Sequence, residues 1–435
     1  MTFANSLSLK EKAHRLIPGG CQTYAKGDDQ YPELAPGFLA RGKGCHVWDV
    51  DGNEFIEYGM GLRSVTLGHA YEPVNESAYR QMQLGHNFVR PSPIESECAE
   101  EFLGLITGAE MVKFGKNGSD ATGGAVRLAR AFTGRDRIAY CGDHPFFSVD
   151  DWFIGTTPMA AGIPAAVSSL SVKFKYNDLA SAEAVFDQYP KQTACVILEP
   201  EKETPPAGRY LQDLKSLCEK NGAVFILDEM ITGFRWHNGG GQAYHNVTPH
   251  LSTFGKALGN GFSISALAGI REIMKLGGFD HDRERVFLMS LTHGAEYPNL
   301  AASIEVMRTY QREPVVETLW RQGERLRTGV ERAIHDQGLE GRFAVLGKPC
   351  CLVFATRDTA GKPSQSLRAL FMQEMIKRGI LAPSFIVSYA HRDEDIDKTV
   401  RAVGESLEIY KSALAEGVEK YLVGHPLKPV FRRYN

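Results

Sequence analysis

Two segments of the chain combine residue types that can carry out chemistry. Asp228 ends the apolar run Ala223–Leu227, and Lys256 lies between glycines in the run Ser252–Gly261. An apolar run that ends in an acid predicts a buried strand whose C-terminal end delivers a carboxylate, where α/β proteins place their ligands. A lysine among small and apolar residues loses its charge easily and becomes a nucleophile able to form a Schiff base. Each residue alone also has a structural interpretation, Asp228 as a helix N-cap and Lys256 as a surface lysine.

A third segment, residues 114–130, adds a candidate phosphate site. An acid for a pyridinium nitrogen and a Schiff-base lysine are what pyridoxal phosphate (PLP) requires of a protein. In the third segment a predicted strand end leads through Gly118 and Ser119 into a strong helix. The free N–H groups and dipole of a helix start bind anions, and a glycine lets the backbone approach the phosphate closely. A plain helix N-cap is the alternative interpretation of this segment.

Composition narrows the class of protein. The 435 residues carry a net charge of −3, which argues against a general nucleic-acid binder. No apolar stretch approaches the roughly 20 residues that span a bilayer, and the N-terminus lacks the apolar core of a secretory signal. The eight cysteines show no CxxC spacing and the 13 histidines no HxxxH or HxH spacing. These patterns predict free thiols, no metal site and a cytoplasmic enzyme.

The order of predicted elements indicates an α/β protein. A helix is expected over residues 1–20, ending at Pro18-Gly19-Gly20, and a β-hairpin over residues 46–58. From about residue 96, helical stretches alternate with short apolar strands, a pattern typical of a helix-covered, mostly parallel sheet. The expected strands are Met111–Phe114, Arg137–Tyr140, Ala194–Leu198, Ala223–Leu227 and Ala266–Ile270. A long helix over Glu317–Asp336 then precedes a mixed α+β segment.

Nearly the whole chain resembles the class III aminotransferases of PLP fold type I, and within them the glutamate-1-semialdehyde 2,1-aminomutase group. The motifs that carry the resemblance are Pro18-Gly19-Gly20, Leu67-Gly68-His69, Asn117–Thr122, Ala131–Asp136, Leu198-Glu199-Pro200, Leu227–Arg235, Thr248-Pro249, Gly255-Lys256 and Leu381–Ser384. The resemblance implies a large PLP-binding domain over residues 66–310. It also implies a smaller α+β domain made of residues 1–65 and 311–435.

The resemblance implies a role for each matched residue. Lys256 forms the Schiff base and then moves protons, and Asp228 keeps the ring nitrogen protonated. The other implied cofactor contacts are Gly118, Ser119, Phe146, Glu199, Met230 and Thr292. Thr292 matches a threonine that reaches the phosphate of the neighbouring subunit, which implies a homodimer with shared active sites.

Substrate positions depart from the pattern of the mutase. Phe146 stands where relatives carry a stacking tyrosine, Lys26 where the mutase has a carboxylate-binding arginine, and Leu62 where it has a tryptophan. Arg63, which follows, is a candidate carboxylate or phosphate ligand, or it pairs with an acid. Lys26 is otherwise a solvated loop lysine, and Glu296 lines the pocket or a subunit interface.

These observations predict transfer of an amino group from an amino-acid donor to a small carbonyl acceptor. The expected course runs through a Lys256 Schiff base and ketimine and pyridoxamine intermediates. The alternative is intramolecular amino transfer of the glutamate-1-semialdehyde 2,1-aminomutase type, because the two chemistries share the cofactor residues. A non-catalytic protein on the same fold is a third hypothesis, which the Asp228 and Lys256 pair disfavours. A dehydrogenase is excluded by the lack of a glycine fingerprint.

Overall fold

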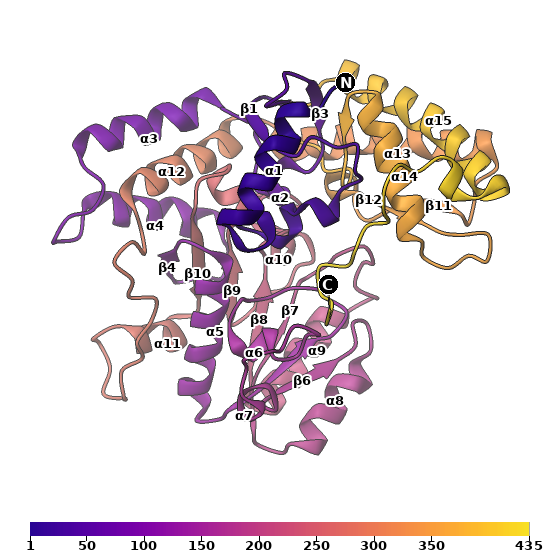
Figure 1. Ribbon diagram of the computed structural model, residues 1–435. Helices are drawn as coiled ribbons and strands as arrows, with labels where there is room; N and C mark the ends of the chain where they lie inside the picture. The colour runs from indigo at the N-terminus through magenta and orange to yellow at the C-terminus, as the bar shows by residue number, and fades with distance from the viewer. Residues whose placement is uncertain (435) are drawn as a thin grey trace. The chain divides into compact units, whose positions relative to one another are not determined.

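The segment Glu72–Val316 is built on a seven-stranded sheet (Figure 1). The computed structural model describes residues 1–434. The strand order is β4–β10–β9–β8–β7–β5–β6, with β4 Met111–Gly115, β5 Arg137–Cys141, β6 Ser171–Phe174, β7 Thr193–Leu198, β8 Val224–Asp228, β9 Leu251–Phe254 and β10 Ser265–Gly269. Strand β10 runs antiparallel to β4 and β9, and the other neighbours pair in parallel. The predicted mostly parallel sheet is therefore confirmed.

Helices flank this sheet, and α5 has a clear capping motif at each end. Their bounds are α3 Glu72–Leu84, α4 Pro93–Leu105, α5 Gly118–Thr133, α6 Asp151–Ile154, α7 Ala165–Ser168, α8 Leu179–Gln188, α9 Tyr210–Lys220, α10 Gly240–Tyr244, α11 Arg271–Met274 and α12 Tyr297–Arg312. Helix α5 begins with a capping box formed by Asn117 and Asp120, and it ends at Gly134, whose φ of 66° is left-handed. A capping box and a left-handed glycine satisfy the backbone groups that helix ends leave unpaired.

The centre of the sheet is apolar on both faces. Every residue of β7 and β8 is buried, and Phe225, Ile226 and Leu227 are each 0% exposed. Parallel strands covered by helices on both faces read as continuous apolar runs, which explains why this part of the sheet was predictable.

The second unit combines residues 1–71 with the chain from residue 317 onward. Its elements are α1 Ala4–Leu16, β1 Leu39–Lys43, β2 His46–Asp49, β3 Glu54–Glu57, α2 Met60–Arg63, α13 Val315–Gln337, β11 Phe343–Leu346, β12 Val353–Thr356, α14 Gln365–Lys377, β13 Ile380–Leu381 and α15 Asp393–Glu416. Short 3-10 turns join them, among them η1 Pro18–Gly20 and η2 Tyr24–Lys26. A four-stranded sheet, β1–β2–β3–β13, brings both ends of the chain together, because β13 pairs in parallel with β3.

The predicted hairpin is present in this unit. Strands β2 and β3 pair antiparallel, with Val47 opposite Phe55. The side chain of Asp49 accepts backbone hydrogen bonds from Asp51 and Asn53 at 3.0 and 2.8 Å, and Gly52 adopts a left-handed φ of 86°. The turn therefore forms as an Asp side chain and a glycine dictate. Among the described helices, none is long and apolar enough to cross a membrane.

Candidate active site

Strand β8 delivers Asp228 to the carboxyl end of the parallel sheet. The side chain is 2% exposed. Its Oδ1 accepts a hydrogen bond from the backbone N–H of Met230 at 3.0 Å and from Oγ1 of Thr253 at 3.1 Å. Two donors on one carboxylate oxygen hold the group in a single orientation.

The pKa of Asp228 reflects its buried position. Burial raises the pKa to about 6, against the lowering effects of the Lys256 charge and the two hydrogen bonds. A nearby cation stabilises the ionised form of a buried carboxylate. Asp228 is thus suited to hold a protonated ring nitrogen.

Lys256 lies just beyond the next parallel strand. Asp228 pairs with Thr253 in the register of β8 and β9, so the lysine follows three residues after the partner of Asp228. The chain turns there through Gly255 into the 3-10 turn η4, Lys256–Gly259, and Lys256 itself has a left-handed φ of 47°. Such a conformation is strained for a residue with a Cβ and clusters at functional sites. The half-buried Lys256 is near enough to Asp228 for its charge to lower the pKa of that carboxyl.

The start of α5 forms the third part of the site. The carboxylate of Asp120 accepts the backbone N–H groups of Lys116 and Asn117 at 3.0 and 2.9 Å, which fixes the turn into the helix. Oγ of Ser119 accepts the backbone N–H of Val149 at 3.0 Å. Because the oxygen is the acceptor in that bond, the hydroxyl proton of Ser119 remains available for donation to an anion.

Met230 joins these three segments. A Cβ added at Gly118 would lie 3.0 Å from Sδ of Met230, and a Cβ added at Gly255 would lie 2.7 Å from the same sulfur. Met230 is 8% exposed and directly follows the Asp228-Glu229 pair. The strand end, the turn before Lys256 and the start of α5 therefore meet at one side chain, and both glycines are required for that approach.

A buried histidine borders the site on the side of strand β7. The backbone N–H of Glu199 donates to Nδ1 of His144 at 3.0 Å, and burial lowers the pKa of His144 to about 3. The imidazole is therefore neutral, with its proton on Nε2. Phe146, two residues later, is 44% exposed and packs edge-on against Phe153 with ring centroids 5.7 Å apart.

Comparison with known proteins decides the family. The model of the class-III aminotransferase family matches residues 27–403. The chain belongs to the class-III aminotransferases. It is 32% identical to a glutamate-1-semialdehyde 2,1-aminomutase of Desulforamulus reducens, covering 92% of this chain and 97% of the relative. It is 30% identical to a 3-aminobutyryl-CoA aminotransferase of Cloacimonas acidaminovorans, covering 95% and 99%.

Solved structures agree with this membership. The PLP internal aldimine form of the FumI protein from Sphingopyxis sp. MTA144 superimposes with a TM-score of 0.86 at 27% identity, covering 95% of this chain and 98% of that one. An omega-transaminase from Sphaerobacter thermophilus gives a TM-score of 0.83 at 26% identity, covering 93% and 98%. The chain therefore has PLP fold type I, and it is a PLP-dependent enzyme.

The residues present fit the cofactor of a class-III aminotransferase. Oδ1 of the buried Asp228 carboxylate accepts from two neutral donors, and a pyridinium N–H would add a cationic one. Ser119 has a hydroxyl proton to donate at the start of α5, where a phosphate is favoured. Lys256, on the neighbouring strand end, provides the amine.

Thr292 and Glu296 lie in the segment that leads into α12 of this aminotransferase. Thr292 is exposed, and its carbonyl accepts the side-chain N–H of Asn87 at 3.0 Å. The carboxylate of Glu296 is 2.7 Å from Nζ of Lys116, which directly precedes the Asn117 cap of α5. The structure thus places Glu296 beside Lys116, which precedes the start of α5.

Lys26 and Arg63 belong to the other unit of the protein. Lys26 is exposed at the end of η2. Arg63 ends a short turn in which Met60, Leu62 and Arg63 have φ values of 42°, 57° and 71° and Gly61 has 59°. Consecutive left-handed residues are rare in L-peptides and cost about 1–2 kcal/mol each, so this turn is a strained feature typical of binding sites.

Sequence reasoning assigned no role to Thr253 or His144. Thr253 lies in Ser252-Thr253-Phe254-Gly255-Lys256, a segment selected only for its lysine. The missing signal was the parallel pairing of β9 with β8, which places the Thr253 hydroxyl on Asp228.

Proposed function

We propose that this class-III aminotransferase transfers an amino group from an amino-acid donor to a small carbonyl acceptor. The proposal depends on a contrast between the residues expected to bind the cofactor and those expected to bind the substrate. The cofactor residues Asp228, Lys256 and Ser119 match the family pattern and lie in a coherent geometry. The substrate positions Lys26 and Leu62 depart from the mutase pattern.

We assign the following roles to this chain's own residues. The bound cofactor supplies an electron sink for the carbanion formed at the amino-bearing carbon. Lys256 Nζ carries the proton that moves during transfer, and Asp228 holds the proton on the ring nitrogen. Gly118 and Ser119 hold the phosphate, Met230 and Phe146 border the ring, and Glu199 and Thr292 complete the cofactor contacts.

Arg63 and Arg368 are the side chains that we propose for a substrate carboxylate. Burial and the charge of Arg63 lower the pKa of Arg368 to about 10. The Arg368 guanidinium donates to the carbonyls of Phe354 and Pro383 at 3.1 and 2.6 Å, so these two bonds bring it no negative charge. An incoming carboxylate would offset the repulsion between the two arginines.

A cavity beside Arg368 gives an anion room on that side of the guanidinium. Arg368 lines this cavity of about 210 Å³ together with Gln30, Tyr31 and Gln365. Arg368→Gln should raise KM for a carboxylate-bearing substrate about tenfold or more, from the loss of a charge-assisted hydrogen bond. Lys26 and Glu296 remain candidates for further substrate contacts.

We also propose a homodimer in a cytoplasmic setting. The exposed position of Thr292 suits a residue that completes the phosphate site of a partner subunit. None of the eight cysteines is in a disulfide in the described part of the chain, and seven of them are buried, which suits a reducing compartment. Analytical ultracentrifugation and mixing of two inactive variants, Lys256→Ala and Thr292→Ala, test shared sites, because a mixed dimer should recover activity.

The alternative is the aminomutase reaction, which the name of the Desulforamulus reducens relative favours. The deciding experiment supplies glutamate-1-semialdehyde to the pyridoxamine-phosphate form with no amino donor present. We expect no catalytic formation of 5-aminolevulinate, while an amino-acid donor converts the pyridoxal-phosphate form. Repeated turnover without a donor would make the protein a mutase and overturn the transfer assignment.

A further inference from the structure

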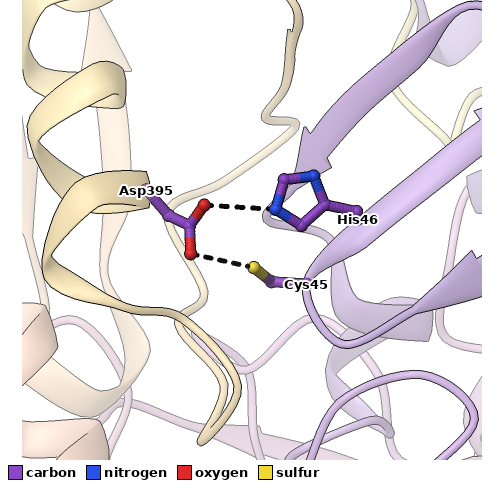
Figure 2. Close-up of side chains that lie close together, drawn as sticks. All are labelled: Cys45, His46 and Asp395. Atoms are coloured by element: carbon purple, nitrogen blue, oxygen red, sulfur yellow. Dashed lines mark hydrogen bonds and ion pairs between the residues drawn. The ribbon is translucent and has the colours of Figure 1, made fainter.

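Cys45, His46 and Asp395 form a cluster in the unit made of residues 1–71 and the chain from 317 onward (Figure 2). His46 is the first residue of β2, Cys45 directly precedes it, and Asp395 lies in the first turn of α15. Oδ1 of Asp395 is 3.1 Å from Nε2 of His46, and Oδ2 is 3.4 Å from Sγ of Cys45. One ligand atom from each of the three residues lies within 4.8 Å of the others.

The histidine stands between two carboxylates. Nδ1 of His46 is 2.8 Å from Oε1 of Glu54, while Nε2 faces Asp395. Ionised carboxylates only accept hydrogen bonds, so a neutral imidazole that donates its Nδ1 proton to Glu54 turns a lone pair toward Asp395. A metal ion bound to both Nε2 and Oδ1 would join these two atoms.

The Cys45 thiol supplies a third potential ligand atom. Cys45 is 2% exposed and directs its sulfur at the same carboxylate that faces the histidine. Thiolate, imidazole and carboxylate are the ligands that Zn²⁺ prefers, with bond lengths of about 2.0–2.3 Å. Tetrahedral bonds of that length place ligand atoms about 3.3–3.6 Å apart. His46 Nε2 and Cys45 Sγ lie 3.1 and 3.4 Å from the two different oxygens of Asp395, so the three side chains are close enough together to share one ion.

Glu54 contacts the ring nitrogen of His46 that would not bind the metal. Ligating histidines usually donate their other ring N–H to a carboxylate, which fixes the tautomer and the ring orientation. The contact between His46 Nδ1 and Glu54 has this geometry. Two of the ligating residues and this partner come from the single hairpin of β2 and β3.

Helix capping accounts for only part of the arrangement. Oδ2 of Asp395 accepts the backbone N–H of Arg392 at 2.9 Å, as expected of a residue in the first turn of a helix. That bond explains the position of the carboxylate. It does not explain why a thiol and an imidazole from a distant hairpin converge on it.

We propose that Cys45, His46 and Asp395 bind a divalent transition-metal ion, Zn²⁺ being the best match, with a fourth position open to water. Asp395 is 349 residues from His46 and 350 residues from Cys45 in the sequence. The ion would therefore link the N-terminal hairpin to α15. Binding releases the thiol proton, and the ion takes the place of the hydrogen bonds to Asp395. The site therefore has a structural role, separate from amino transfer.

The test measures metal binding to the PLP-loaded enzyme. After treatment with a chelator and dialysis against Zn²⁺, elemental analysis should find one bound ion per chain. Cys45→Ser should lower the affinity at least about tenfold, and Glu54→Gln should lower it about 10–100-fold. Cys21→Ser is the matched control, because that thiol is more exposed and donates to its local Thr23 carbonyl.

A second readout identifies the ligands directly. Co²⁺ in place of Zn²⁺ should give intense visible ligand-field bands of a four-coordinate site, at wavelengths beyond the absorption of the cofactor. Those bands should be lost in Cys45→Ser and in His46→Gln and retained in Cys21→Ser. Absence of stoichiometric metal from the wild type, or bands that survive both ligand substitutions, would overturn the proposal.

Discussion

Thr253 Oγ1 donates a hydrogen bond of 3.1 Å to Asp228 Oδ1 across the parallel pairing of β9 with β8. The two residues lie opposite each other in register, and Lys256 follows Thr253 by three positions. The hydroxyl therefore holds the acid, while its own strand delivers the amine. One pair of neighbouring strands sets the spacing between the two principal groups of the site.

Thr253→Val should weaken the hold on ionised Asp228. Loss of a hydrogen bond to a charged group costs about 1.5 kcal/mol and raises the pKa of Asp228, which is already raised to about 6. We expect kcat to fall about tenfold at pH 7, with a larger loss at pH 6 than at pH 8. Thr309→Val is the control, since that buried hydroxyl bonds to its own helix at Glu305. A ratio of wild-type to variant rates that does not change with pH would contradict this role.

Asp228→Asn should stabilise the cofactor-free protein at neutral pH while removing activity. The pKa of Asp228 is raised from 3.8 to about 6 in the folded protein, chiefly by burial. The folded state then binds the proton more tightly than the unfolded state, so wild-type stability falls as pH rises from about 4 to about 6. The uncharged variant escapes this cost, which amounts to about 3 kcal/mol at most.

Thermal unfolding of the two cofactor-free proteins at several pH values measures this effect. The variant should unfold at a higher temperature at pH 7, and the difference should vanish near pH 4. An equal difference at both pH values would show that the charge of Asp228 is not its source.

Lys256→Ala should separate cofactor binding from turnover. The phosphate site around Ser119 is intact in the variant, so PLP should still bind, although more weakly and without a covalent link. Turnover should fall at least about 10²–10⁴-fold, the usual contribution of a positioned proton carrier. Lys275→Ala, at a half-buried lysine in a 3-10 turn, should keep both properties. Substantial activity in Lys256→Ala would remove the lysine from the mechanism.

Gly329 and Gly404 lie in the long helices α13 and α15, and substitution of each by alanine should change stability in opposite directions. A Cβ at Gly329 of α13 would lie 2.4 Å from Cγ2 of Val400 in α15, whereas a Cβ at Gly404 of α15 meets no atom within 4 Å. Gly329→Ala should destabilise the protein by about 1–3 kcal/mol through overpacking. Gly404→Ala should stabilise it by about 0.5–1 kcal/mol, because alanine favours helix. Shifts of the thermal midpoint in the same direction would contradict this account of the packing.

The predictable parts of the fold are those whose residues are uniformly apolar or have strong turn chemistry. The buried run ending at Asp228 and the Asp-Gly hairpin were both predicted and are both present. Strand β9 was not predicted, because Ser252 and Thr253 are polar although both are buried. These polar side chains made the strand unrecognisable from the sequence, although its pairing with β8 determines where Lys256 lies.

Contacts between residues far apart in the sequence could not be predicted either. The absence of local histidine and cysteine spacing predicted no metal site, since a spacing rule sees only nearby residues. Asp395 reaches His46 across 349 positions, through the folding of the two chain ends into one unit. Likewise, the approach of Arg63 to Arg368 depends on tertiary structure and left no local pattern.

The most direct test of the central claim is to locate the covalent link to the cofactor. The PLP-loaded enzyme is reduced with sodium borohydride, digested, and analysed by mass spectrometry for the pyridoxyl group. We predict a single labelled residue, Lys256, with loss of the label when excess amino donor is added before reduction. A label on another lysine, or none at all, would contradict the assignment of this site.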